Sequence, residues 1–136
     1  MRKETFRYIE ALLYYHDENK KMLHEMEKDI ILTNKNNNDE NVGGGKSNVI
    51  ISKIENIIIK LDSDKKLYNM RENIKIVDEV LDHVSEPYKK LIHMKYFSKK
   101  KYSWLQICEV LHVGRRTAFR MRKKVIEEIA DRLGLV

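Results

Sequence analysis

Apolar residues in the first third of the chain recur mostly at three- and four-residue steps. They are Phe6, Ile9, Leu12, Leu13, Leu23, Met26 and Ile30. This spacing places them along one face of an α-helix. We therefore predict an amphipathic N-terminal helix over residues 1–33, with a candidate break at residues 16–19.

The next segment, residues 34–48 (NKNNNDENVGGGKSN), contains a single apolar residue. Its Asn, Gly and Lys content buries too little surface to offset the entropy of ordering, which predicts a flexible loop. Apolar spacing then returns at Ile50, Ile54, Ile57, Leu61, Leu67, Met70, Ile74, Val77, Leu81 and Val84. We predict one long helix or two over residues 49–84.

The apolar residues of this long helix form a narrow stripe, here called the seam. The six-residue step from Leu61 to Leu67 breaks the heptad phase of the seam. A kink or a local overwinding of a coiled coil would accommodate such a step. Two packing partners are open for the seam. One is a second copy of the chain, which would make residues 49–84 an oligomerisation helix in a homodimer, and the other is the chain's own N-terminal helix.

Residues 85–136 predict three further helices. Ser85 and Pro87 mark the first helix start, because Ser can cap a helix and Pro fits the first turn. This helix reaches about Phe97, and Ser103 can cap the next one. A three-residue turn ending at Gly114 leads into the last helix. The residues expected to face inward on the last two helices are Trp104, Ile107, Cys108, Leu111, Ala118, Met121, Val125, Ile129 and Leu133. The predicted fold class is all-α.

Charge is distributed unevenly along the chain. Residues 1–84 hold 14 Lys and Arg against 16 Asp and Glu, a net of −2, whereas residues 85–136 hold 13 against 5, a net of +8. A basic C-terminal region beside a balanced N-terminal region is typical of a protein that contacts phosphates with one domain. This pattern, together with the short helix, turn and basic helix, predicts a helix-turn-helix DNA-binding domain over residues 85–136.

The second helix of that motif enters the major groove and presents its first turns to base edges. We expect base contacts from Arg115, Arg116, Thr117, Phe119 and Arg120. Phe119 has two interpretations, contact with a thymine methyl or packing. We expect phosphate or backbone contacts from Lys99, Lys100, Lys101, Ser103, Gln106, Arg122, Lys123 and Lys124. An RNA partner is less favoured, because the aromatic residues are placed for packing instead of for stacking on bases.

The segments YSWLQICEVLH and VGRRTAFRMRKKVIEEIADRLG are similar to the RinA/ArpU group of phage transcriptional regulators, and more distantly to the region of sigma factors that contacts the −35 element. The Asn41-Val42-Gly43-Gly44 pattern between two helices also resembles that group. The resemblance implies a phage-encoded activator of late packaging and structural genes. Family members often carry Ser where Gly114 stands here, which removes a side-chain cap.

Several other classes of protein are disfavoured. The Gly43-Gly44-Gly45-Lys46-Ser47 segment fails the phosphate-loop pattern, because the first glycine of that pattern would fall at Glu40. The five histidines form no pair at i, i+4, which disfavours a metal site. No acidic pair is placed for acid–base chemistry. We therefore expect a protein without enzymatic activity that binds no metal, cofactor or small-molecule substrate. No apolar run reaches the length of a membrane span, which predicts a cytoplasmic, nucleoid-associated protein in a bacterial host.

Three alternatives remain within the helical class. A terminase small subunit also combines a helix-turn-helix with oligomerising helices, although it usually places them in the reverse order. A sigma-like factor would require a polymerase-binding region in residues 1–84. Host RNA polymerase is a candidate partner both for a regulator and for a sigma-like factor. A coiled-coil interaction protein would not lose DNA binding on substitution of Arg115.

Overall fold

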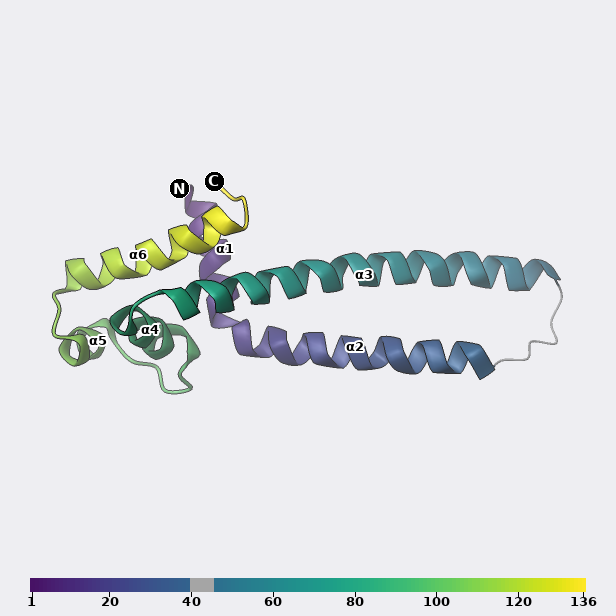
Figure 1. The fold of residues 1–136 in the computed structure, drawn as a ribbon, viewed down its shortest axis with the longest axis horizontal. Helices are drawn as coiled ribbons and strands as arrows, with labels where there is room; N and C mark the ends of the chain where they lie inside the picture. The colour runs from purple at the N-terminus through teal and green to yellow at the C-terminus, as the bar shows by residue number, and fades with distance from the viewer. Residues whose placement is uncertain (40–45) are drawn as a thin grey trace. The chain divides into compact units, whose positions relative to one another are not determined.

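The computed structural model describes residues 1–39 and 46–136, and for parts of its second and third helices it describes the backbone alone. All elements in these residues are helices, so the all-α prediction is confirmed (Figure 1). In chain order the elements are α1 Lys3–Tyr14, α2 His16–Asp39, α3 Lys46–His83, α4 Glu86–Ile92, the π-helical turn η1 His93–Phe97, α5 Trp104–Leu111 and α6 Arg115–Arg132.

The predicted boundaries hold best in the C-terminal half. The break in the first helix lies at Tyr15, one residue before the predicted range 16–19, where φ of −100° and ψ of 11° leave the helical region. The predicted loop is too long, because α2 continues to Asp39 and α3 begins at Lys46. Extending an existing helix costs less than starting one, and Asn and Lys extend it at modest cost. The rest of the predicted loop, residues 40–45, lies outside the described residues.

The long helix α3 is continuous from Lys46 to His83, so the six-residue step in the apolar pattern does not divide it into two helices. Ser85 takes the N-cap position of α4 in extended backbone, as expected, with Pro87 in the first turn. The Ser85 side chain makes no capping hydrogen bond. The helix start therefore depends on the backbone preference of Ser85 and on Pro87.

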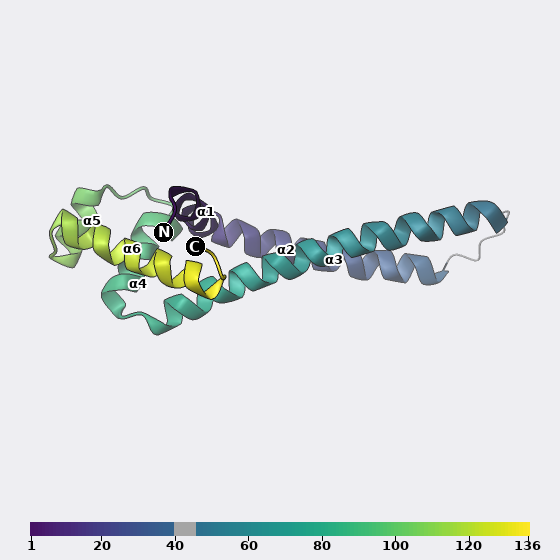
Figure 2. The same ribbon diagram turned by 90° about the horizontal axis from the view of Figure 1, so that it is seen from above.

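The chain divides into two compact units that differ from the four predicted ranges. The first unit combines Met1–Glu18 with Asn73–Val136, and the second is Asn19–Glu72. Helix α1 belongs to the first unit because Ile9 and Leu13 are fully buried in the same core as α6. Figure 2 shows the two ends of the chain close together, and the Thr5 hydroxyl donates a hydrogen bond to the backbone oxygen of Val136 at 2.7 Å.

The core of the first unit is built from fully buried aliphatic side chains on five elements. These are Ile9, Leu13, Val77, Val80, Leu91, Ile92, Ile107, Val125, Ile126 and Ile129. Each such side chain contributes about 1.5–3 kcal/mol through its burial. The inward positions predicted on α6 are confirmed for Ala118, Met121, Val125 and Ile129, and Leu133 is partly buried. Ile126 and Ala130 are buried as well, so the apolar face of α6 is wider than predicted.

The second unit pairs α2 with α3. The guanidinium of Arg71 lies 2.9 Å from the Glu27 carboxylate, and Leu67 is almost fully buried. Part of the α3 seam therefore packs within the chain. Ile54 and Tyr68 on α3 nevertheless remain more than half exposed. Within the residues that the structure describes, no helix combines the length and the apolar character of a membrane span.

Candidate nucleic-acid interface

The turn between α5 and α6 has the three residues that the sequence predicts. Helix α5 starts with a reciprocal cap, in which the Ser103 hydroxyl accepts from the Gln106 backbone N–H and the Gln106 side-chain oxygen accepts from the Ser103 N–H. It ends at His112, which adopts the left-handed conformation with φ of 56°. Gly114 then caps α6 in extended backbone. The cap at the start of α5 and the left-handed residue at its end together fix where α6 begins.

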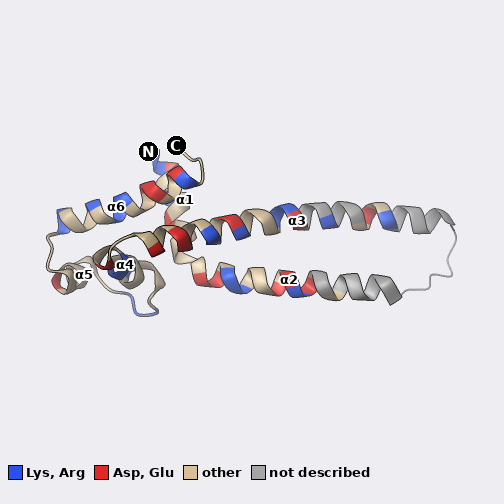
Figure 3. Cartoon of the chain, in the orientation of Figure 1, with Lys and Arg blue, Asp and Glu red and all other residues tan. Residues whose placement is uncertain are grey.

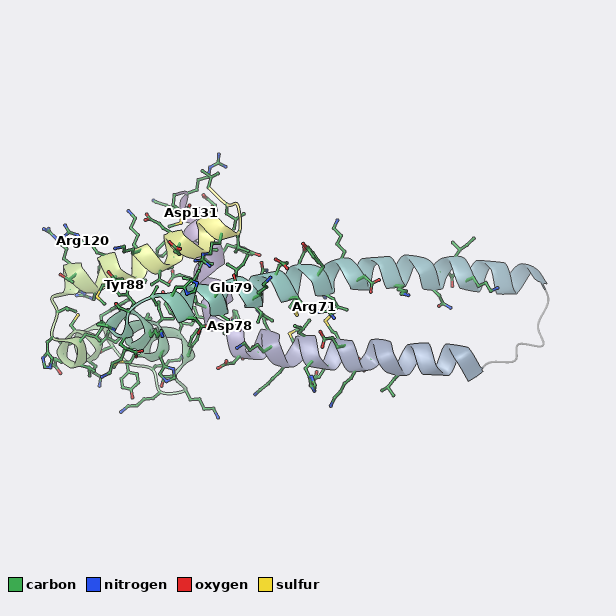
Figure 4. The ribbon with its side chains drawn as sticks, in the orientation of Figure 1. Arg71, Asp78, Glu79, Tyr88, Arg120 and Asp131 are labelled. Atoms are coloured by element: carbon green, nitrogen blue, oxygen red, sulfur yellow. The ribbon has the colours of Figure 1, made fainter. Side chains whose placement is uncertain are left out.

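The outward face at the start of α6 is basic. Arg115, Arg116, Thr117 and Arg120 are exposed, as are Lys123 and Lys124. A hollow of about 390 Å³ on this face is lined by Arg115, Arg116, Phe119, Arg120 and Lys123. Figure 4 shows the Arg120 side chain pointing away from the body of the unit. Four cations therefore surround one shallow depression that a ligand can reach.

Three of these cations have no carboxylate partner among the residues that the structure describes. Among the described residues, no carboxylate oxygen lies within 4 Å of the guanidinium groups of Arg115, Arg116 or Arg120, whereas Lys123 pairs with Glu127 at 3.8 Å. The first turn of α6 also contains no acidic residue. Arg115 and Arg116 lie in this first turn, where cations oppose the helix dipole by about 0.3–1 kcal/mol each. The arrangement lowers helix stability, and it suits the binding of an anion.

Phe119 was expected either to contact a thymine methyl or to pack, and its ring packs against a neighbouring helix. Its ring is half-buried and meets the Trp104 ring edge-on, with centroids 4.8 Å apart. The Arg115 guanidinium lies 5.6 Å from the centre of the same ring. Phe119 thus forms the floor of the hollow and holds α6 against α5.

Arg122 departs from its expected place among the phosphate contacts, because it points inward. Its guanidinium carbon lies 5.2, 4.9 and 5.1 Å from the ring centres of Phe6, Trp104 and Phe119. One of its nitrogens lies 3.7 Å from a carboxylate oxygen of Glu10 on α1. A signal for this was present in the sequence, since Arg122 lies one turn after Ala118 and one turn before Ile126, on the buried stripe.

From the sequence Tyr96 was expected to pack in the core, and Glu10 was not singled out. The Tyr96 hydroxyl donates to the Glu10 carboxylate at 2.8 Å, and burial together with this hydrogen bond raises the pKa of the Tyr96 phenol well above its ordinary range. The phenol therefore stays protonated and remains a donor. The two residues are 86 positions apart, so no local pattern connects them.

The lysine run at Lys99, Lys100 and Lys101 is exposed, but it does not join the cations of α6. Figure 3 shows the run in the connection that leads to α5, at the bottom of the view, whereas the basic start of α6 lies at the left, above α5. The Lys100 ammonium lies over the Tyr102 ring, at 5.3 Å from its centre. Ser103 and Gln106 are exposed and still have the hydroxyl proton and the amide NH₂ to donate, since the reciprocal cap uses only their oxygens as acceptors.

The described residues contain no group of three His, Cys, Asp or Glu side chains that could hold a metal ion. Their distinctive feature is the exposed, largely unpaired basic face on a helix that follows a short helix and a tight turn. Fold and site together define a small all-helical protein with one exposed basic helix start, whose charge suits an anionic ligand.

Comparison with known proteins places the chain in a family. It belongs to the family described as protein of unknown function (DUF722), which matches residues 1–131. The chain is also similar to the transcriptional activator rinA of Staphylococcus phage phi11, with 25% identity over 134 residues that cover 98% of this chain and 94% of the relative. The RinA-like resemblance seen in the sequence is therefore confirmed. No solved structure matches the chain significantly.

Proposed function

We propose that this protein is a phage transcriptional regulator, an activator without enzymatic activity, that binds duplex DNA through the basic start of α6. The observation that carries the proposal is a set of exposed arginines at that helix start that pair with no carboxylate of the described part of the chain, Arg115, Arg116 and Arg120. The similarity to a protein named transcriptional activator supports the same function. In this proposal α5, the turn and α6 form a helix-turn-helix.

The dimensions of the basic segment suit the major groove. A helix with its side chains is about 10–12 Å across, which fits the major-groove width of about 12 Å, and the ten residues Arg115 to Lys124 span about 15 Å along it. We assign Arg115, Arg116 and Arg120 to base edges, because a guanidinium can donate two hydrogen bonds to guanine. Thr117, Lys123 and Lys124 are assigned to phosphates or to flanking bases. Arg122 and Phe119 pack on the inward side of α6 and hold the helix that carries these residues.

Duplex DNA is favoured over single-stranded RNA because the aromatic rings near the basic face are engaged in packing. Trp104 and Phe119 contact each other, and Tyr96 is buried against Glu10. Readers of single-stranded nucleic acid need exposed rings on which bases stack. A helix whose outward face carries arginines and no exposed ring is better suited to a groove.

We further propose that the protein acts as a homodimer on promoters of late phage genes, in contact with host RNA polymerase. The support for a dimer is the exposed apolar surface of α3, where Ile54 and Tyr68 are 52% and 63% exposed. These two residues are 14 positions apart and lie on nearly the same face of the helix. Paired copies would bring two α6 helices to two half-sites on the DNA.

The test is to incubate the purified protein with fragments of its source genome at moderate salt, recover the bound duplexes and sequence them. We expect enrichment of a site next to the promoter of late genes. Enrichment of a packaging-start region would favour a terminase small subunit instead. Binding without any enrichment over bulk DNA would contradict a sequence-specific regulator.

A pair of variants connects this experiment to the proposed site. Arg116→Ala should abolish or weaken the enrichment, since it removes one of the exposed cations of α6. Lys66→Ala is the matched control, because it removes one exposed positive charge from the other unit. Equal enrichment for both variants would place the DNA contact elsewhere.

A further inference from the structure

Glu10 on α1 connects two elements that are far from it in the sequence. One of its carboxylate oxygens accepts the Tyr96 hydroxyl hydrogen bond at 2.8 Å and lies 3.7 Å from the Arg122 guanidinium. The side chains of Glu10 and Arg122 are only 22% and 21% exposed. A carboxylate and a guanidinium held out of water at this distance attract each other more strongly than a surface pair.

Arg122 is enclosed on its other sides by aromatic rings. Phe6 from α1, Trp104 from α5 and Phe119 from α6 itself lie about 5 Å from its guanidinium carbon. Its Nε is buried and finds no hydrogen-bond acceptor among the described residues. Within the part of the chain that the structure describes, Glu10 is the only carboxylate paired with this guanidinium.

The position of Arg122 on α6 determines what this pairing controls. Arg122 lies two residues after Arg120, and therefore on a nearly opposite side of the helix from the outward face. The Phe119 ring that contacts Arg122 also lines the hollow between Arg116 and Arg120. A rotation of α6 by about 20° would move side-chain ends on its outward face by about 2 Å. That displacement is enough to break a bidentate hydrogen bond to a base.

We propose that Glu10 is a positioning residue for DNA recognition, which fixes the rotation of α6 through Arg122 and thereby the direction of Arg116 and Arg120. Tyr96 fixes the Glu10 carboxylate in turn. This inference rests on the DNA-binding function proposed above. It makes α1 part of the DNA-reading domain without requiring any contact between α1 and the DNA.

The experiment measures the affinity of the full-length protein for two duplexes, one with the enriched genomic site and one with the same composition in scrambled order. The variants are Glu10→Gln, Tyr96→Phe and the double variant Glu10→Gln with Arg122→Met. Glu4→Gln is the matched control, because it removes the same charge from an exposed position of α1. Binding is measured at a temperature where denaturation curves show each variant to be folded.

We expect Glu10→Gln to lower affinity for the genomic site by about tenfold and to leave affinity for the scrambled duplex at the level of Glu4→Gln. Tyr96→Phe should lower the ratio of the two affinities in the same direction by less. An unchanged ratio in Glu10→Gln would overturn the proposal, and so would an equal loss on both duplexes, which indicates a purely structural role.

Two further outcomes are informative. If Glu10→Gln does not fold, because it leaves a buried cation without a partner, the double variant removes that cation and should fold with a lowered ratio. An unchanged ratio in the folded double variant would overturn the proposal. Equal binding of both duplexes by the unaltered protein would contradict the proposed function itself, and this inference with it.

Discussion

The two halves of α6 differ in charge and in burial. The first ten residues, Arg115 to Lys124, carry six basic and no acidic side chains, whereas the last eight, Val125 to Arg132, carry three acidic side chains and one basic. In the second half Ile126 and Ile129 are fully buried, and Arg132 pairs with Glu128 and Glu79. In the first half the buried residues are Ala118 and Met121.

This difference indicates how a single helix can hold a binding surface without losing its place in the fold. The second half contributes the large aliphatic side chains and the two ion pairs of Arg132, and it anchors the helix. The first half buries little and carries its cations at the unfavourable end of the helix dipole. Local features that lower stability at one position are typical of functional sites whose cost is offset elsewhere.

Among the substitutions considered, the largest effect on stability should come from one in the second, anchoring half of α6, Val125 to Arg132. Ile129→Ala removes a fully buried side chain and should lower the free energy of unfolding by about 2–5 kcal/mol, through lost burial and a residual cavity. Chemical denaturation measures this change. DNA affinity of the folded fraction should stay close to that of the unaltered protein. A loss below about 1 kcal/mol would show that this half does not anchor the helix.

The next effect should come from the binding half. Arg120→Ala should weaken specific binding by about 1–3 kcal/mol and relax the preference at one base pair, because one bidentate contact is lost. Competition binding against duplexes with single base changes measures both. The free energy of unfolding should hardly change, since Arg120 is exposed. Full affinity and full preference in this variant would remove Arg120 from the DNA contact.

A smaller effect tests how far the binding surface extends. Lys123→Ala should weaken binding to all duplexes to a similar extent. It should also reduce the slope of log affinity against log salt by about one, the value for one phosphate contact. Lys100→Ala should change this slope less, because the lysine run lies apart from the basic start of α6 (Figure 3). Equal slopes for the two variants would extend the DNA face to the lysine run.

The smallest effect concerns the junction before the first half. Gly114→Ser should raise the free energy of unfolding by a few tenths of a kcal/mol, because a Ser hydroxyl can cap α6. No heavy atom lies within 4 Å of the position that its Cβ would take. Gly134→Ser is the control and should destabilise, since Gly134 has a φ of 72°. Thermal unfolding of the two variants measures the contrast, and stabilisation by both would contradict it.

Much of α6 could be predicted from the sequence. The 3.6-residue period correctly separated Ala118, Met121, Val125 and Ile129 from the exposed Arg116 and Arg120. The same period, applied strictly, would also have placed Arg122 on the buried stripe. Its basic neighbours Lys123 and Lys124 led to the expectation of a phosphate contact, because charge clustering alone does not reveal direction.

Local spacing, caps and charge distribution thus determined the helices, the turn before α6 and the basic face, since each depends on residues within about one or two turns of one another. Only the tertiary structure placed α1 in the core beside α6, joined Glu10 to Tyr96 and Arg122, and separated the lysine run from the basic start of α6. These arrangements depend on residues 86 and 112 positions apart. Contacts of that kind leave no periodic trace along the chain, because they arise from how helices pack and not from how one helix turns.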